Sequence, residues 1–323
     1  MDAPKTLLEA ILYFADYENC RQFMIGLRFE DGKVTCPYCG SAKVTYLEKA
    51  RVYRCYGDHA KQKFSLKIGT IMEDSAIGLE KWFPAMWLLA NCKNGVSSYE
   101  IHRALGVTQK SAWFMLQRIR LAMKNQTISK LGSGGEPVEM DETFVGGKEK
   151  NKHKSKRGRG AGYSGKMSGA QGKTIVVGML ERKGRVKAEV VVERTKAALH
   201  LVANNNLAPG AKLITDEWGG YDGINFERAV INHAQEYVNG TIHTQGIENF
   251  WAMLKRSLGG TYISVEPFHL ERYIDEQSYR FNNRATKDNP LTDLDRFMGV
   301  VAQITGKRLT YAELTGKVGE TQL

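Results

Sequence analysis

A run of small and polar residues, SKLGSGGEPV (129–138), interrupts the chain and limits what it can fold into. Glycine, serine and proline at this density break helices and strands, so the elements on its two sides are separate. Before this run, apolar residues recur at helical spacing, and after it strand-forming runs alternate with helical ones. A chain of 323 residues has room for about two domains. The pattern therefore predicts a helical N-terminal part followed by an α/β domain with a mixed sheet.

Cysteines mark a small module in the N-terminal part. CPYCG contains Cys36 and Cys39, and Cys55 follows in YRCYGDHAKQKFSLKIGT. A C-x-x-C pair among short strand-like runs is typical of a zinc ribbon, although a ribbon held by packing alone is an alternative. Asp58 stands where a second C-x-x-C would have its cysteine, and His59 is one residue further on. Sites of three cysteines and one histidine are common and those with an aspartate are rare, so we expect one structural Zn²⁺ ion with His59 as fourth ligand and Asp58 as the alternative.

The segment 75–128 has the signals of a helix-turn-helix. Ser97 and Glu100 have the spacing of a capping box, which predicts a helix over 98–105. A glycine turn follows, and then a second helix that Thr108 caps. Ordinary helical hairpins share this pattern, so it leaves both interpretations open. In a helix-turn-helix, the first turn of the second helix faces the major groove of DNA, and here it carries Gln109, Lys110 and Ser111.

The net charge of +11 favours a polyanionic partner, most often nucleic acid. The charge is densest in GGKEKNKHKSKRGRGAGYSGKMSGAQGK (146–173), which is too rich in glycine and lysine to bury a core. Such a segment is usually a solvated charge run, but beside a sheet it is suited to neutralising phosphates. The cations that we expect to contact the DNA backbone are Lys154, Lys156, Arg157 and Arg159.

Membrane and secretory classes are disfavoured. No apolar run approaches the roughly 20 residues that span a bilayer. The N-terminus carries acidic residues and has no basic region before a cleavage site. Five cysteines, an odd number, fit a reducing cytosol better than a disulfide framework.

Three acidic residues stand where the apolar context makes a charge costly. Asp141 lies in VEMDETFVGG, Asp216 ends the apolar run KLITD, and Glu248 lies near the start of an amphipathic helix. Carboxylates of this kind suit Mg²⁺, and a pair of such ions can promote phosphodiester chemistry. Lys255 is two helical turns after Glu248 on the same face, so it can reach a phosphate beside the metals. A strand-end aspartate alone is more often a turn or cap residue, and two adjacent acids compete for the assignment: Glu142 and Glu217.

Together these motifs resemble a known family, the bacterial insertion-sequence transposases of the DDE superfamily. The resemblance is to the ISXO2-like group, which has an N-terminal zinc ribbon and a ribonuclease-H-like catalytic domain. It covers about residues 20–300 and rests on CPYCG, FSLKIGTIMEDS, KNGVSSYEIHRALGVTQKSAWFMLQRIRLAM, MDETFVGG, TDEWGGY, HTQGIENFWAMLKRSLGGTY and RYIDEQSYRFNNR.

The resemblance implies a catalytic triad of Asp141, Asp216 and Glu248 that binds two Mg²⁺ or Mn²⁺ ions. It places Lys255 against the transposon end. The alternatives for the third ligand are Gln245 and Asn249. The helix-turn-helix and the ribbon would bind the terminal inverted repeats, and the catalytic domain would cleave and transfer DNA strands.

The resemblance also implies a homodimer or larger synaptic complex, because two DNA ends must be joined, and a cytoplasmic, nucleoid-associated location. Two other classes remain open: an inert transposase-derived DNA-binding protein, and a ribonuclease-H-like nuclease. We expect an N-terminal helical segment (1–30), a zinc ribbon (31–74), a helix-turn-helix region (75–128), a linker (129–137), a catalytic domain (138–300) with the basic insertion 146–173, and a C-terminal tail (301–323).

Two pairs of residues are interpreted as structural. Asp275 and Glu276 lie on a helix with several arginines and are expected to form ion pairs rather than bind metal. Trp218 and Trp251 are expected to serve core packing in preference to base stacking.

Overall fold

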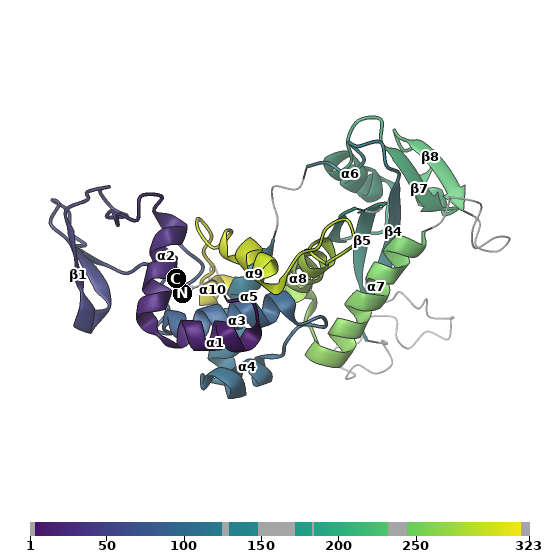
Figure 1. Cartoon of the computed structure of the whole chain (residues 1–323). Coiled ribbons are helices and arrows are strands. Elements are labelled where there is room, and N and C mark those ends of the chain that lie inside the picture. Colours follow the sequence, from purple (N-terminus) through teal and green to yellow (C-terminus); the bar gives the residue numbers. More distant parts are fainter. Residues whose placement is uncertain (1–3, 125–128, 148–171, 183, 232–243, 318–323) are drawn as a thin grey trace. The chain divides into compact units, whose positions relative to one another are not determined.

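The computed structural model describes residues 4–124, 129–147, 172–182, 184–231 and 244–317 (Figure 1). The chain divides into two compact units, one made of Met1–Lys124 with Ala285–Leu323 and the other of Asn125–Arg284. Among the described residues, no helix is long and apolar enough to cross a membrane.

The first unit joins a helical core to a small antiparallel sheet of order β1-β2-β3. Aromatic rings from distant segments form the core: Phe14 lies 4.7 Å from Phe83 and 5.6 Å from Phe297 between ring centroids. The elements of this unit are α1 (Leu7–Ala15), α2 (Tyr17–Arg28), β1 (Val44–Leu47), β2 (Val52–Cys55), β3 (Lys63–Phe64), α3 (Leu79–Asn91), α4 (Ser98–Leu105), α5 (Gln109–Met123), α9 (Asp293–Val301) and α10 (Tyr311–Leu314).

The helix pair predicted at 98–123 is confirmed as α4 and α5. Ser97 and Glu100 form a complete capping box. Gly106 takes a left-handed conformation with φ of 59°, and the Thr108 side chain accepts a hydrogen bond from the Ser111 N–H. Local hydrogen bonding and the freedom of glycine at positive φ therefore set both helix ends.

The second unit is an α/β fold around a five-stranded sheet of order β6-β5-β4-β7-β8. β5 is antiparallel to β4 and β6, whereas β7 is parallel to both β4 and β8. This order and these directions are those of the ribonuclease-H-like fold that we expected. Its elements are β4 (Val138–Val145), β5 (Thr174–Glu181), β6 (Val186–Val191), α6 (Lys196–Asn206), β7 (Lys212–Asp216), β8 (Glu227–Ile231), α7 (Gln245–Ser257) and α8 (Leu270–Asn282).

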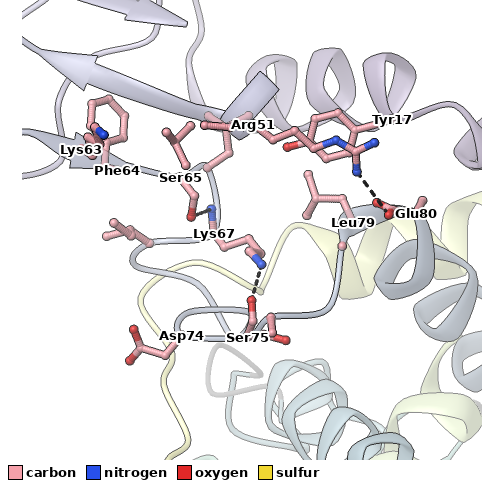
Figure 2. Close-up of a pocket in the computed structure, with 16 residues that line it drawn as sticks. Tyr17, Arg51, Lys63, Phe64, Ser65, Lys67, Asp74, Ser75, Leu79 and Glu80 are labelled. Carbon is pink, nitrogen blue, oxygen red and sulfur yellow. Dashed lines mark hydrogen bonds and ion pairs between the residues drawn. The ribbon is translucent and has the colours of Figure 1, made fainter. Parts of the chain in front are cut away.

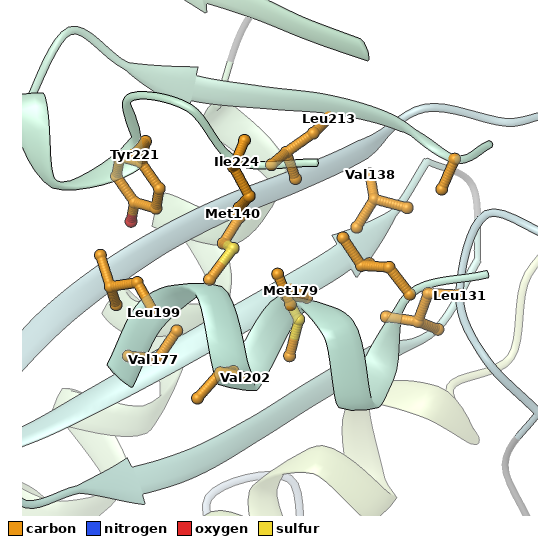
Figure 3. Close-up of a cluster of buried hydrophobic side chains, with 13 residues drawn as sticks. Leu131, Val138, Met140, Val177, Met179, Leu199, Val202, Leu213, Tyr221 and Ile224 are labelled. Carbon is orange, nitrogen blue, oxygen red and sulfur yellow. The ribbon is translucent and has the colours of Figure 1, made fainter. Parts of the chain in front are cut away.

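Both faces of this sheet are covered. On one face, α6 packs on Met140 and Met179, as Figure 3 shows. On the other face, Val176 and Leu180 contact α7 and α8. Side chains alternate along β4, so Val138 and Met140 point towards α6, whereas Glu139 and Asp141 point towards α7.

The structure divides the chain differently from the expected ranges. The second unit ends at Arg284, not 300, because the apolar face of α9 is buried against α3 in the first unit. The expected linker is in part packed structure: Leu131 is fully buried beside α6, and its carbonyl accepts from the Ala208 N–H at 2.8 Å. The expected C-terminal tail is also anchored, since Leu314 is buried and the Leu309 carbonyl accepts from Arg118 Nε at 3.1 Å.

Candidate functional sites

The ribbon brings three thiols and one imidazole together. The ligand atoms of Cys36, Cys39, Cys55 and His59 all lie within 4.8 Å of one another, and Asp58 is not in this group. Cys36 Sγ lies 3.4 Å from His59 Nε2, and Cys39 Sγ lies 3.6 Å from Cys55 Sγ. A Zn–S length of about 2.3 Å gives a tetrahedral edge of about 3.8 Å between two sulfurs, so the spacing suits a zinc ion.

Gly57 closes this thiol cluster from the backbone side. Its N–H donates to Cys55 Sγ at 3.2 Å. A Cβ at position 57 would lie 2.9 Å from Cys39 Sγ and 3.3 Å from Cys55 Sγ. The chain thus turns between Cys55 and His59 at a residue without a side chain, and this turn carries the imidazole to the thiols.

A cavity of about 520 Å³ lies next to the ribbon in the same unit (Figure 2). Two of its cations already have partners: Arg51 lies 4.0 Å from the Tyr17 ring centroid and 3.4 Å from the Glu80 carboxylate. Lys67 Nζ donates to the carbonyls of Ser75 and Ile77. Because these contacts join the ribbon to the start of α3, we interpret the cavity as a structural junction.

The first two acids of the expected triad end up on neighbouring parallel strands. The last paired residues of β4 and β7 are Glu139 and Ile214. Asp141 and Asp216 each lie two residues beyond this pair. The two acids therefore stand opposite each other and point to the same face of the sheet. The Trp218 N–H donates to Asp216 Oδ1 at 3.1 Å and orients this carboxylate where the strand ends.

The pKa of Asp141 reflects its burial and the acids around it. Burial, together with the negative charges of Glu142 and Asp216, raises the pKa of the Asp141 carboxyl from the ordinary 3.8 to about 6. A hydrogen bond from the Trp251 side chain opposes this shift. Repulsion between carboxylates is what a bound cation would relieve, so the donor set fits a hard divalent ion.

Two buried hydrogen bonds tie α7 to β4. The Glu139 carboxylate accepts from the Ile247 N–H at 2.9 Å, as an acid at a helix N-terminus is expected to do. Trp251 Nε1 donates to Asp141 Oδ2 at 2.9 Å. Glu248 lies between Ile247 and Trp251 in the sequence, and its carboxylate accepts a hydrogen bond from the Thr244 hydroxyl at 3.1 Å.

Glu248 and Lys255 are both exposed on α7. At 3.6 residues per turn, they lie within about 60° of Trp251 around the helix axis. The helix therefore presents an acid and a cation on the flank next to Asp141. Asn249 is also exposed, and Gln245 is the first residue of the helix.

The adjacent acid Glu142 belongs to the opposite face of the sheet. Its buried carboxylate accepts from the Tyr221 hydroxyl and pairs with Arg194. Burial and the charge of Glu142 raise the pKa of Tyr221. Arg194 in turn lies 3.6 Å from the Trp218 ring centroid. Glu142 is thus paired within the protein on the far face, so of these two neighbouring acids Asp141 is the one that faces α7.

The three triad carboxylates do not form a closely packed ligand group. In the described part of the chain, the ribbon cluster is the one group of three or more such side chains close enough to hold a metal ion. A single ion shared by all three acids would need such closeness, whereas two ions divided among them would not.

The expected DNA-contacting residues are placed in part. In the first turn of α5, Lys110 is exposed, with Nζ 4.8 Å from the Tyr311 ring centroid. Gln109 is half-buried and donates to Ser98 Oγ at 2.9 Å, and Ser111 is half-buried beside Thr108. The basic cluster lies outside the described residues: Lys154, Lys156, Arg157 and Arg159.

Residues 133–282 match the family model described as the ISXO2-like transposase domain. A protein described as "Uncharacterized protein in transposable element ISH50", from Halobacterium salinarum, is 25% identical over 255 residues, covering 76% of this chain and 84% of that protein. The two matches support an insertion-sequence transposase, with residues 133–282 as its ISXO2-like transposase domain. The matched segment contains all three acids of the expected triad.

A solved structure is also similar to this chain. It is a simian T-cell lymphotropic virus intasome in complex with the PP2A regulatory subunit B56 gamma, with a TM-score of 0.31 and 12% identity. The match covers 66% of this chain and 72% of that chain. Similarity at this level supports no functional comparison.

The sequence alone did not indicate the roles of two residues beside Asp141. Trp251 was assigned to core packing; it is packed, with 4% of its surface exposed, but it also donates to Asp141. Glu139, which holds the start of α7, received no role. One signal was present: Gly178 interrupts the strand-forming run TIVVGMLE, and a glycine inside a strand often marks a close approach of another group.

Proposed function

We propose that this transposase binds the ends of an insertion sequence and catalyses cleavage and transfer of DNA strands. The observation that carries the proposal is the shared register of Asp141 and Asp216 on the neighbouring inner strands β4 and β7, beside a helix that carries Glu248. The match of residues 133–282 to the ISXO2-like transposase domain supports the same conclusion.

In this proposal Asp141, Asp216 and Glu248 hold two Mg²⁺ or Mn²⁺ ions. Such ions supply electrostatic stabilisation where negative charge develops during phosphoryl transfer. The chain's own groups prepare the site: the Trp218 N–H orients Asp216, and the sheet holds Asp141 beside it. Lys255 would contact a phosphate of the DNA end, and its exposure on the same helix as Glu248 supports this assignment.

The other parts of the chain serve DNA recognition in this proposal. The first turn of α5, in which Lys110 is exposed and Gln109 and Ser111 are half-buried, is the segment that would enter the major groove. The ribbon, with a Zn²⁺ ion on its three thiols and His59, would stabilise a second contact region. Because two ends must be joined, we propose a homodimer or larger synaptic complex acting on nucleoid DNA.

The test uses purified full-length protein and a DNA fragment that carries the inverted repeats flanking its gene. With Mg²⁺ or Mn²⁺, the wild type should cleave at the repeat end and join it to target DNA. Asp216→Asn should lower cleavage by at least 1,000-fold, about 4 kcal/mol in barrier, while DNA affinity stays within about threefold. Glu217→Gln is the matched control, because it removes the adjacent exposed charge, and it should cut normally.

The outcomes separate the classes of function. Binding of the repeat ends without nicking under either metal would favour an inert DNA-binding protein. Cutting of structured nucleic acid without selection of a repeat end would favour a nuclease. A fully active Asp216→Asn variant would contradict the triad.

A further inference from the structure

The contact between Trp251 and Asp141 joins a buried indole to a carboxylate of the proposed metal site. Trp251 has 4% of its surface exposed, and its Nε1 lies 2.9 Å from Asp141 Oδ2. Its ring also packs against Phe250, with centroids 5.1 Å apart. The packing holds the indole N–H in one place, and a hydrogen bond from a fixed donor limits how far the carboxylate can rotate.

Gly178 of β5 makes room for this indole. It is the residue paired with Asp141 across the β4–β5 ladder. A Cβ at this position would lie 2.5 Å from Trp251 Cη2, 2.6 Å from Cζ2 and 2.9 Å from Ile247 Cδ1. These distances are well below the 3.5–4.0 Å of ordinary carbon contacts, roughly an ångström too short. The indole therefore occupies the space that any side chain at 178 would need.

We propose that Trp251 is a positioning residue whose indole N–H fixes the orientation of the Asp141 carboxylate before a divalent cation binds, and that Gly178 is required for this contact. The proposal rests on the assignment of Asp141 as a metal ligand. In proteins, partners that orient a metal ligand commonly change metal affinity by about 10- to 100-fold when they are removed. A tryptophan that served packing alone would change stability and leave metal affinity unaltered.

Trp251→Phe separates the two roles, because it keeps an aromatic ring and removes the N–H. The matched control is Trp87→Phe. Trp87 is a buried tryptophan of the first unit with 1% of its surface exposed, and its Nε1 has no hydrogen-bond partner among the described residues. The control thus makes the same ring substitution without removing a hydrogen bond.

The experiment measures binding of Mn²⁺ alone to the full-length protein, loaded with zinc beforehand, from the electron paramagnetic resonance signal of the free ion. Trp251→Phe should raise the dissociation constant about tenfold. Gly178→Ala should raise it as well, because the new methyl group displaces the indole. Trp87→Phe should stay within twofold of the wild type. In cleavage assays, Trp251→Phe should shift the midpoint in Mg²⁺ and recover most of its rate at saturating Mg²⁺.

Asp141→Asn distinguishes the failure of this inference from the failure of the proposed function. If Asp141→Asn weakens Mn²⁺ binding while Trp251→Phe and Gly178→Ala bind as the wild type does, the positioning role is refuted and the metal site stands. If Asp141→Asn also binds as the wild type does, the metal site itself is refuted, and the positioning role falls with it.

Discussion

Asp141→Asn is expected to stabilise the metal-free protein at neutral pH. Asparagine has nearly the shape of aspartate, so the substitution removes the charge and keeps the packing of β4. The pKa of the Asp141 carboxyl is about 6 in the folded protein against an ordinary 3.8. Each pKa unit corresponds to about 1.4 kcal/mol, so ionisation of Asp141 lowers the free energy of unfolding by up to roughly 3 kcal/mol. We expect a gain of about 1–3 kcal/mol in the variant.

The pH dependence of this gain follows from the direction of the shift. Because the folded pKa lies above the unfolded one, the folded state binds the proton more tightly between about pH 4 and pH 6. The free energy of unfolding of the wild type therefore falls as the pH rises through this window. The asparagine variant does not titrate there, so the difference between the two proteins should be near zero at pH 4 and reach its maximum above pH 6.

Amide hydrogen exchange of β4 and β5 measures this difference in the full-length protein. Exchange is followed from pH 4 to pH 8 without added divalent cation, with correction for the intrinsic rate at each pH. Glu217→Gln, the exposed neighbouring acid of the β7 end, should leave the exchange of both strands unchanged. Addition of Mg²⁺ should stabilise the wild type and reduce the gap to Asp141→Asn.

Two results would refute the reasoning. A stability difference that is the same at pH 4 and pH 8 would mean that the charge of Asp141 is not what destabilises the sheet. A variant less stable than the wild type above pH 6 would mean that the ionised carboxylate makes favourable contacts that outweigh its burial.

Two further predictions concern the ribbon and α8. His59→Ala should lose close to one zinc ion per chain by elemental analysis, whereas Asp58→Ala should keep it; the reverse result would make Asp58 the ligand. Glu276→Ala should lower the free energy of unfolding by about 3–5 kcal/mol, because it leaves Arg280 buried without the carboxylate it pairs with. The measurement is the free energy of unfolding from a urea titration. In it, the double variant Glu276→Met with Arg280→Leu should lose less stability than Glu276→Ala, because neither charge is then left unpaired. An equal loss would argue against this ion pair.

Local features of the fold were predictable from the sequence because the interactions involved span only a few residues. The capping box of Ser97 and Glu100, the left-handed Gly106 and the Thr108 cap each satisfy backbone groups within one turn. The division between helical and strand-rich parts was likewise visible in the spacing of apolar residues. The amphipathic helix expected around Glu248 is α7, and its apolar residues are the buried ones: Ile247, Phe250, Trp251 and Leu254.

Interactions between distant segments were decided only by the tertiary structure. An apolar stripe predicts that a helix has a buried face without naming its partner, so the sequence did not indicate that α9 and Phe297 pack in the first unit. The sequence does not distinguish two adjacent acids, because the face of the sheet to which each one points depends on how the strand packs. In the fold, Asp141 points towards α7 and Glu142 towards Tyr221.

The chain by itself therefore determined the zinc-ribbon pattern, the helix pair and the three candidate acids in apolar surroundings. The tertiary structure decided which side chains meet: His59 and not Asp58 with the thiols, Asp141 beside Asp216 across two strands, and Trp251 over Gly178. The physical reason is the range of the forces. Capping and periodicity act within a few residues, whereas register and side-chain direction depend on how whole elements pack.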